Sequence, residues 1–124
     1  MKKILLIDDS LTVRMELRAV FEQSEFELRE AADGEEAIES FTRDPDLDLI
    51  ICDYNMPGLD GLSTIEKIFE IQPERKVSCI MLTTESSSEL KERGKAIGIK
   101  GWILKPFKKE MLLKGVNAIL SKAA

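Results

Sequence analysis

Reactive side chains follow four of the short apolar runs in this sequence. Asp8 and Asp9 come directly after the run 4–7, and Asp53 comes directly after the run 49–52. Two later runs are followed by hydroxyl groups and by an amine, on Thr83, Thr84 and Lys105. If these runs are parallel strands of one sheet, the side chains meet at the edge where such sheets bind ligands. This grouping allows chemistry that a single carboxylate does not.

The three carboxylates would repel one another at close range unless their charge is compensated. Protonation is one solution, and a bound hard cation is another. The chain contains no histidine, and an all-oxygen ligand set favours Mg²⁺ or Mn²⁺. Such an ion would keep positions for water and for a phosphate oxygen. The second solution therefore predicts a divalent metal site at Asp8, Asp9 and Asp53.

A carboxylate beside such an ion can attack phosphorus and hold the phosphoryl group as an acyl phosphate. The metal would neutralise the incoming oxygens, while Lys105 and the Thr83 hydroxyl would hold the remaining ones. This is phosphoryl transfer by positioning and charge, and it requires no general base.

Each of these residues also has a simpler interpretation. Asp9 could begin a turn in which Ser10 caps the next helix. Asp53 could open an Asx-turn, and Lys105 could be a solvated loop lysine. Any one residue alone favours the simpler interpretation, but the arrival of all of them at one edge favours a site.

Short apolar segments alternate with longer amphipathic ones along the whole chain. The strands are predicted at 4–7, 26–31, 49–52, 77–82 and 102–104. The helices are predicted at 11–24, 34–43, 61–71, from a capping box at 86–89 to 97, and at 109–120. The second strand begins by alternating apolar and polar residues, which places it at an edge and favours the order 2-1-3-4-5. The expected fold class is α/β, a flavodoxin-like, doubly wound (βα)5 three-layer sandwich.

The fourth helix is expected to be poorly anchored. Its apolar residues are only Leu90, Ala96 and Ile97, and Gly94 lowers its helix propensity. Such a helix can be displaced at a low cost in free energy.

The composition is that of one globular domain over residues 1–124, with 44% hydrophobic residues and no run long enough to span a membrane. The absence of histidine excludes histidine metal sites and Ser-His or Cys-His nucleophile pairs. A net charge of -5 argues against nucleic acid as a partner. Cys52 and Cys79 lie in apolar runs and are expected to be buried, reduced thiols of a cytoplasmic protein.

Four segments resemble the response-regulator receiver domain of two-component signalling, and in particular the single-domain chemotaxis regulators. They are LLIDDS at 5–10, DYNMPGLDG at 53–61, MLTTE at 81–85 and KPF at 105–107. Each motif is weak alone, but their order and spacing agree and the resemblance covers the whole chain.

The resemblance implies that Asp53 is the phospho-acceptor. It implies that Asp8 and Asp9 hold Mg²⁺ together with Asp53 and the backbone carbonyl of Asn55. Thr83 would reach the phosphoryl group and Lys105 would pair with it. The resemblance also implies a cis peptide bond between Lys105 and Pro106.

The chain departs from the commonest family pattern at two positions. Thr84 stands where a small residue is usual and, with Glu85, would govern access to the phosphoryl group. Trp102 stands where the switching aromatic is usually Tyr or Phe. The expected switch draws Thr83 toward the phosphoryl group, and Trp102 repacks into the vacated space.

A histidine kinase is the expected phosphodonor, and the expected output is binding to a separate protein, because no output domain follows the last helix. Residues 1–85 hold 9 basic and 20 acidic side chains, whereas residues 86–124 hold 9 basic and 3 acidic ones. An acidic partner, a flagellar motor switch or a phosphorelay or kinase protein, is therefore expected on the face of helix 4, strand 5 and helix 5. Its basic residues are Lys91, Arg93, Lys95, Lys100, Lys108, Lys109 and Lys114.

The expected protein is a monomeric switch, not an enzyme beyond its own phosphoryl transfer and slow autodephosphorylation. A phosphorelay intermediate and a receiver-like scaffold that needs no phosphate remain as alternatives. An FMN site is disfavoured because Asp8 and Asp9 would repel its phosphate. A haloacid-dehalogenase-type phosphatase would want an Asp-x-Asp pattern rather than adjacent acids.

Overall fold

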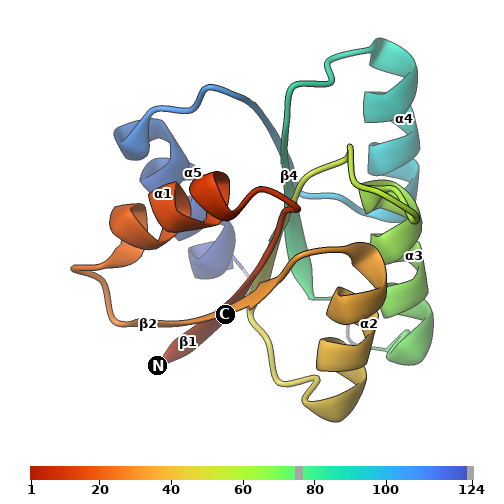
Figure 1. The fold of residues 1–124 in the computed structure, drawn as a ribbon, viewed down its shortest axis with the longest axis horizontal. Helices are drawn as coiled ribbons and strands as arrows, with labels where there is room; N and C mark the ends of the chain where they lie inside the picture. Colours follow the sequence, from red (N-terminus) through yellow and green to blue (C-terminus); the bar gives the residue numbers. More distant parts are fainter. Residues whose placement is uncertain (75–76, 123–124) are drawn as a thin grey trace.

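The computed structural model describes residues 1–74 and 77–122 and contains a five-stranded parallel sheet (Figure 1). The strands lie in the order β2-β1-β3-β4-β5, which confirms the predicted topology. Their bounds are β1 Lys2–Ile7, β2 Phe26–Ala31, β3 Leu49–Cys52, β4 Ser78–Thr83 and β5 Gly101–Leu104. The helices are α1 Leu11–Phe21, α2 Gly34–Arg43, α3 Gly61–Ile71, α4 Ser88–Ile97 and α5 Lys109–Lys122.

Burial along the strands follows their place in the sheet. Strands β3 and β4 are buried at every residue, and β1 is buried from Ile4 onward. The edge strand β2 buries only Ala31. A central parallel strand is covered on both faces and needs apolar residues throughout, whereas an edge strand does not.

The helices cover the two faces of the sheet in two groups (Figure 1). Helices α2 and α3 pack on one face with Phe41, Leu62 and Ile65 fully buried, and α4 adds partly buried side chains there. Helices α1 and α5 pack on the opposite face, where Leu17 and Leu112 are buried. The three-layer sandwich predicted from the sequence is therefore confirmed.

The predicted ends of several elements shift by a few residues. Strand β1 begins at Lys2, because main-chain pairing with Phe26 continues below the apolar run. Helix α1 ends at Phe21, where the Ser24 amide donates to the Phe21 carbonyl and forms a turn. Strand β4 is displaced by one residue, and α5 continues to Lys122.

Two details of the predicted fourth helix are wrong. The N-cap of α4 is Ser87, whose hydroxyl accepts from the Leu90 amide at 3.2 Å, so the capping box at 86–89 does not form. Ala96 is exposed and anchors nothing. Within α4, all of which is described, Gly94 is the only buried residue, so the expected poor anchoring is confirmed.

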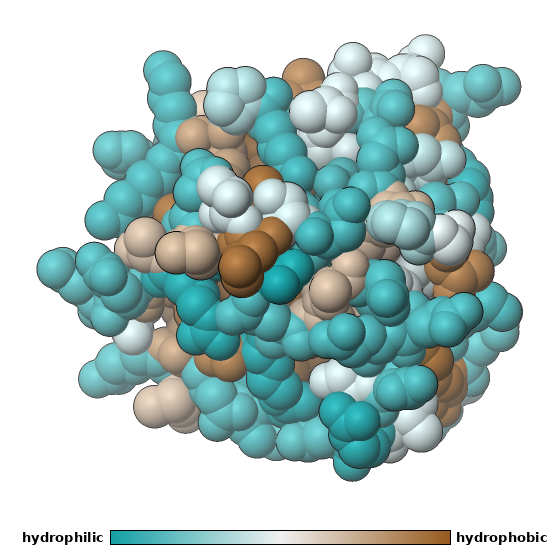
Figure 2. Space-filling view, viewed as in Figure 1, coloured by the Kyte–Doolittle hydropathy of each residue, from teal (hydrophilic) through white to brown (hydrophobic). Residues whose placement is uncertain are grey.

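No helix among the described residues is both long and apolar enough to cross a membrane. The face of the molecule shown in Figure 2 is mostly hydrophilic, with hydrophobic groups scattered among the polar ones.

Candidate functional site

The register of the sheet brings Asp8 and Asp53 together. Strands β1 and β3 are paired so that Ile7 lies opposite Cys52, and the next residue of each chain leaves the sheet at the same edge. The Asp53 amide donates to the Ile7 carbonyl at 3.0 Å, which continues the ladder one step. Both carboxylates are buried, with exposures of 2% for Asp8 and 7% for Asp53.

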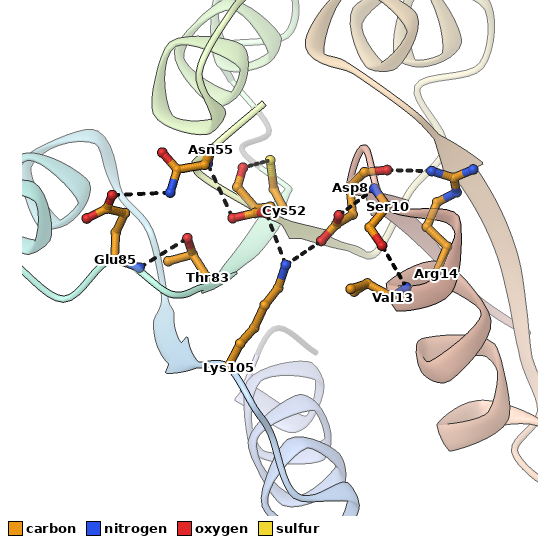
Figure 3. A network of polar contacts seen from close by, with 10 residues as sticks. Asp8, Ser10, Val13, Arg14, Cys52, Asn55, Thr83, Glu85 and Lys105 are labelled. Carbon is orange, nitrogen blue, oxygen red and sulfur yellow. Dashed lines mark hydrogen bonds and ion pairs between the residues drawn. The ribbon is translucent and has the colours of Figure 1, made fainter. Parts of the chain in front are cut away.

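Lys105 lies between these two carboxylates (Figure 3). Its Nζ is 2.8 Å from Asp8 Oδ2 and 3.0 Å from Asp53 Oδ2. Its amide donates to the Thr83 carbonyl at 3.0 Å, which fixes where the side chain starts. The implied cis peptide between Lys105 and Pro106 is present. Partial burial lowers the pKa of Lys105, but the hydrogen bonds and charges of Asp8 and Asp53 outweigh it, and its pKa lies above the ordinary value.

Asp8 is held at each of its polar groups. Its amide donates to the Ala31 carbonyl at 3.1 Å, and its Oδ1 accepts from the Ser10 amide at 2.9 Å. Its backbone carbonyl accepts from Arg14 Nη1 at 2.5 Å, a contact visible in Figure 3. Arg14 was not among the residues selected from the sequence, because a basic residue in the first turns of a helix gives no signal of such a contact.

The acidic cluster suits a hard divalent cation. Asp8, Asp9 and Asp53 each offer an oxygen, and these atoms lie within 4.8 Å of one another. Asp9 is exposed, so an ion could reach the cluster from solvent. The Asn55 amide donates to Asp53 Oδ1 at 3.3 Å, so the main chain of Asn55 passes beside the same carboxylate. A donor set of oxygens alone fits Mg²⁺.

A hydrogen bond joins the loops that follow β3 and β4. Asn55 Nδ2 donates to Glu85 Oε1 at 3.2 Å, which links the two loops (Figure 3). Thr83 is fully buried, and its hydroxyl accepts from the Glu85 amide at 3.4 Å. Thr84 is exposed. Thr83 and Glu85 therefore belong to one short polar network beside Asp53, while Thr84 points to solvent.

Trp102 connects β5 to this network. Its indole Nε1 donates to the backbone carbonyl of Glu85 at 2.8 Å. The ring also lies against α4, since a Cβ on Gly94 would sit 3.2 Å from Trp102 Cζ3. Trp102 is partly buried, so the ring touches both the loop that follows Thr83 and the helix that follows the loop.

Gly61, the first residue of α3, also shapes the site and was not selected from the sequence. A Cβ at this position would lie 2.1 Å from the Asp53 carbonyl oxygen, so only glycine allows α3 to begin so close to Asp53. Its amide donates to the Tyr54 carbonyl at 2.9 Å.

The two cysteines are free and buried, as predicted. Burial is the main cause that raises the pKa of both thiols, so they stay protonated. Cys52 donates from Sγ to the Asp53 carbonyl at 3.2 Å.

The basic face differs from its prediction at one residue. The six lysines are exposed, but Arg93 is turned toward α3. Its Nη2 lies 2.9 Å from Glu66 Oε1 and 3.2 Å from Ser63 Oγ. A long arginine side chain can reach either neighbouring helix, so its helical position did not decide between them. We define the basic face by Lys91, Lys95, Lys100, Lys108, Lys109 and Lys114.

Comparison with known proteins agrees with this geometry. The family model of the response regulator receiver domain matches residues 4–117. The chain is 30% identical over 121 residues to the protein PilH of Pseudomonas aeruginosa, covering 98% of this chain and 99% of PilH.

Two solved structures are also similar. The chemotaxis protein CheY4 of Vibrio cholerae has a TM-score of 0.89 and 36% identity, with 96% of this chain and 98% of that chain covered. A complex of CheX and CheY from Borrelia burgdorferi with BeF3 and Mg matches with a TM-score of 0.89 and 28% identity, covering 95% and 88% of the two chains.

Proposed function

Because this chain belongs to the response regulator receiver domain family, we propose that it is a phospho-acceptor switch of a two-component system. In this proposal residues 1–124 form a single receiver domain, and a histidine kinase supplies the phosphoryl group to Asp53. The observation that carries the proposal is the burial of Asp53 between Lys105 and two further carboxylates.

The reaction is a direct phosphoryl transfer. An oxygen of Asp53 forms a bond to phosphorus while the bond from phosphorus to the donor's histidine nitrogen breaks, and that electron pair stays on the imidazole. Lys105 already lies 3.0 Å from Asp53, so its ammonium group is placed to pair with the transferred oxygens. Burial of Asp53 keeps water away and strengthens this pairing.

Asp8, Asp9, Asp53 and the backbone carbonyl of Asn55 would hold Mg²⁺, or alternatively Mn²⁺. The bound ion supplies positive charge that offsets the charge of the phosphoryl oxygens. Support comes from the oxygen cluster and from the similar Borrelia CheY, whose complex contains BeF3 and Mg.

The switch would pass through Thr83 and Trp102. We expect the phosphoryl group to draw the Thr83 hydroxyl away from the Glu85 amide, which now donates to it at 3.4 Å. Trp102 is bonded to the carbonyl of the same Glu85, so its ring should repack when this loop moves. Glu85 and Thr84 would set how easily water reaches the phosphoryl group.

The donor would dock at the rim of the acceptor site. Leu11 and Met15 on α1 are 61% and 62% exposed, Leu104, which precedes Lys105 in the chain, is 45% exposed, and Met111 on α5 is 64% exposed. If these side chains form one surface patch, that patch would suit contact with the donor protein. Met15→Glu should slow transfer from the kinase but leave phosphorylation by acetyl phosphate unchanged.

The output partner would be an acidic protein on the basic face, either a flagellar motor switch or a phosphorelay protein. Lys91, Lys95 and Lys100 surround a cavity of about 200 Å³ beside Trp102. The protein would act as a cytoplasmic monomer, in which its free thiols remain reduced. It would be a signalling protein rather than an enzyme acting on other substrates.

Intact-mass measurement after incubation with Mg²⁺ and acetyl phosphate tests the acceptor. We expect one added phosphoryl group, and we expect Asp53→Asn to abolish it while circular dichroism shows a folded protein. A folded wild-type protein without added mass would instead support a scaffold that needs no phosphate. Turnover of unrelated phosphate esters would support a phosphatase.

Charge reversal tests the output face. The double variant Lys91→Glu and Lys95→Glu should weaken binding of the phosphorylated protein to its flagellar switch or phosphorelay partner and reduce the salt dependence of that binding. Lys67→Glu on α3 is the matched control, because Lys67 is exposed but lies outside the basic face. Unchanged affinity in the double variant would show that these lysines serve only solubility.

A further inference from the structure

Arg14 is a mostly buried cation that the proposed phosphoryl transfer does not use. Its side chain is 14% exposed, and its guanidinium makes two directed contacts. Nη1 donates to the backbone carbonyl of Asp8 at 2.5 Å, and Nε donates to Glu30 Oε1 at 2.7 Å. One planar group therefore joins the end of β1 to β2.

The contact with Asp8 replaces a missing ladder bond. Strand β1 ends at Ile7, so the Asp8 carbonyl lies beyond the paired residues of the sheet. The other polar groups of Asp8 are bonded to Ala31, Ser10 and Lys105. Arg14 supplies the remaining partner, and it acts on the peptide group that joins Asp8 to Asp9. A buried carbonyl without such a partner would cost free energy.

Glu30 orients the guanidinium. Its carboxylate accepts from Arg14 and also from Arg18, one turn further along α1. The hydrogen bond from Arg18 is the main cause that lowers the pKa of Glu30. Partial burial acts in the opposite direction, but the hydrogen bond from Arg14 lowers the pKa further, so Glu30 stays charged. Glu30 immediately precedes Ala31, the partner of the Asp8 amide. Strand β2 thus holds Asp8 both directly and through Arg14.

We propose that Arg14 is a positioning residue for the acidic cluster, and that it sets the affinity for a divalent cation by fixing the peptide group between Asp8 and Asp9. It contacts Asp8 and Glu30, and it would bind neither the ion nor the phosphoryl group directly. This inference rests on the metal site of the proposed function. Support of this kind around metal ligands typically changes metal affinity by about 10–100-fold when it is removed.

Charge and geometry predict opposite effects, which makes the proposal testable. Removing a cation near three carboxylates would tighten binding of a divalent ion if Arg14 acted only through its charge. Removing a support would weaken binding. Arg14→Lys keeps the charge but cannot bridge Asp8 and Glu30 with a planar fork, whereas Arg14→Met removes both.

The test is a titration of each variant with Mn²⁺, followed by the loss of the electron paramagnetic resonance signal of the free ion, with competition by Mg²⁺. We expect Arg14→Lys and Arg14→Met each to raise the dissociation constant about ten-fold. Arg18→Lys is the matched control: it also contacts Glu30 but not Asp8, and its dissociation constant should stay within about two-fold of the wild type. Amide hydrogen exchange of the metal-free protein should be faster at Ser10 in the Arg14 variants alone.

The outcomes separate the two proposals. If wild type binds no divalent ion, the metal site of the proposed function fails. If wild type binds the ion and Arg14→Lys matches it, only the role of Arg14 fails. Equal effects of Arg14→Lys and Arg18→Lys, or tighter binding by Arg14→Met, would also overturn that role. Arg14→Lys preserves the test if Arg14→Met does not fold.

Discussion

Helices α3 and α4 cover the same face of the sheet but are held very differently. They have 11 and 10 residues, yet α3 buries six residues whereas α4 buries only Gly94. The six are Gly61, Leu62, Thr64, Ile65, Ile68 and Phe69. Helix α4 is held by partly buried side chains and by the ring of Trp102, which packs against Gly94. Arg93 adds hydrogen bonds to Ser63 and Glu66 on α3.

The difference suits the two separate tasks that we propose for these helices. Asp53, the proposed acceptor, lies directly against the first residue of α3, so a firmly packed helix would keep its carboxylate in place. Helix α4 borders the basic face, where a proposed signal must appear as a change of shape. Elements with few buried apolar contacts open at the lowest free energy. The following predictions test this contrast, from the largest expected effect to the smallest.

Alanine at the two helical glycines should give the largest contrast. In Gly61→Ala the new methyl would lie 2.1 Å from the Asp53 carbonyl oxygen, so backbone must move, and we expect a loss of about 3 kcal/mol. In Gly94→Ala the methyl would lie 3.2 Å from the Trp102 ring and in ordinary contact with Ile99 at 3.5 Å. The gain in helix propensity offsets the tight contact with the ring, so the change should stay within about 1 kcal/mol. Urea unfolding measures both, and equal losses would contradict the contrast.

Truncating one leucine in each helix compares their packing. Leu62 in α3 is fully buried, and Leu62→Ala should lower the free energy of unfolding by about 3 kcal/mol. Leu90 in α4 is only partly buried, and Leu90→Ala should cost about 1 kcal/mol. Hydrogen exchange should show the amides of α4 opening before those of α3. A similar cost for both substitutions would mean that α4 is held as firmly as α3.

Trp102→Phe should destabilise the loop between β4 and α4 without affecting the surroundings of Asp53. The substitution removes the 2.8 Å bond from the indole to the Glu85 carbonyl, at a cost of about 1 kcal/mol. We expect faster amide exchange at residues 84–87 and an unchanged rate of phosphorylation by acetyl phosphate. A slower phosphorylation rate would show that the ring also supports the acceptor side.

Acidic pH should slightly lower the free energy of unfolding, because Glu30 becomes protonated. The pKa of Glu30 is lowered in the folded protein, so its contribution is present above its ordinary value near 4.5 and is lost as the pH falls through the folded pKa. Because the carboxylate is 26% exposed, we expect less than about 1 kcal/mol. The free energies of unfolding of wild type and Glu30→Gln should differ at neutral pH and become equal at acidic pH. A constant difference would contradict this.

The fold follows from the sequence because the central strands β1, β3 and β4 carry continuous apolar runs, whereas the edge strand β2 begins by alternating apolar and polar residues. Alternation at Phe26 and Leu28 was enough to place β2 at the edge. Helix ends were harder, because they depend on caps. Any of three adjacent serines could cap α4, and the extended backbone conformation at Ser87 makes this residue the N-cap.

The meeting of Asp8, Asp53 and Lys105 also follows from topology, since parallel strands end at one edge. The roles of arginines do not, because their long side chains can reach partners on several elements. Neither the contact of Arg14 with a main-chain carbonyl nor the turn of Arg93 toward α3 leaves a pattern in the sequence. Ala96 is exposed because of the way α4 is rotated about its axis. The helix has too few apolar residues for its sequence to predict that rotation.

Trp102 is the only tryptophan in the chain, and it lies where β5, α4 and the loop after β4 meet. Indole fluorescence responds to hydrogen bonding and to hydration of the ring. The ring is therefore an intrinsic fluorescent probe at the place where the proposed switch would pass from Thr83 to α4. Stopped-flow emission recorded without any attached dye would time the movement of this junction against the arrival of the phosphoryl group.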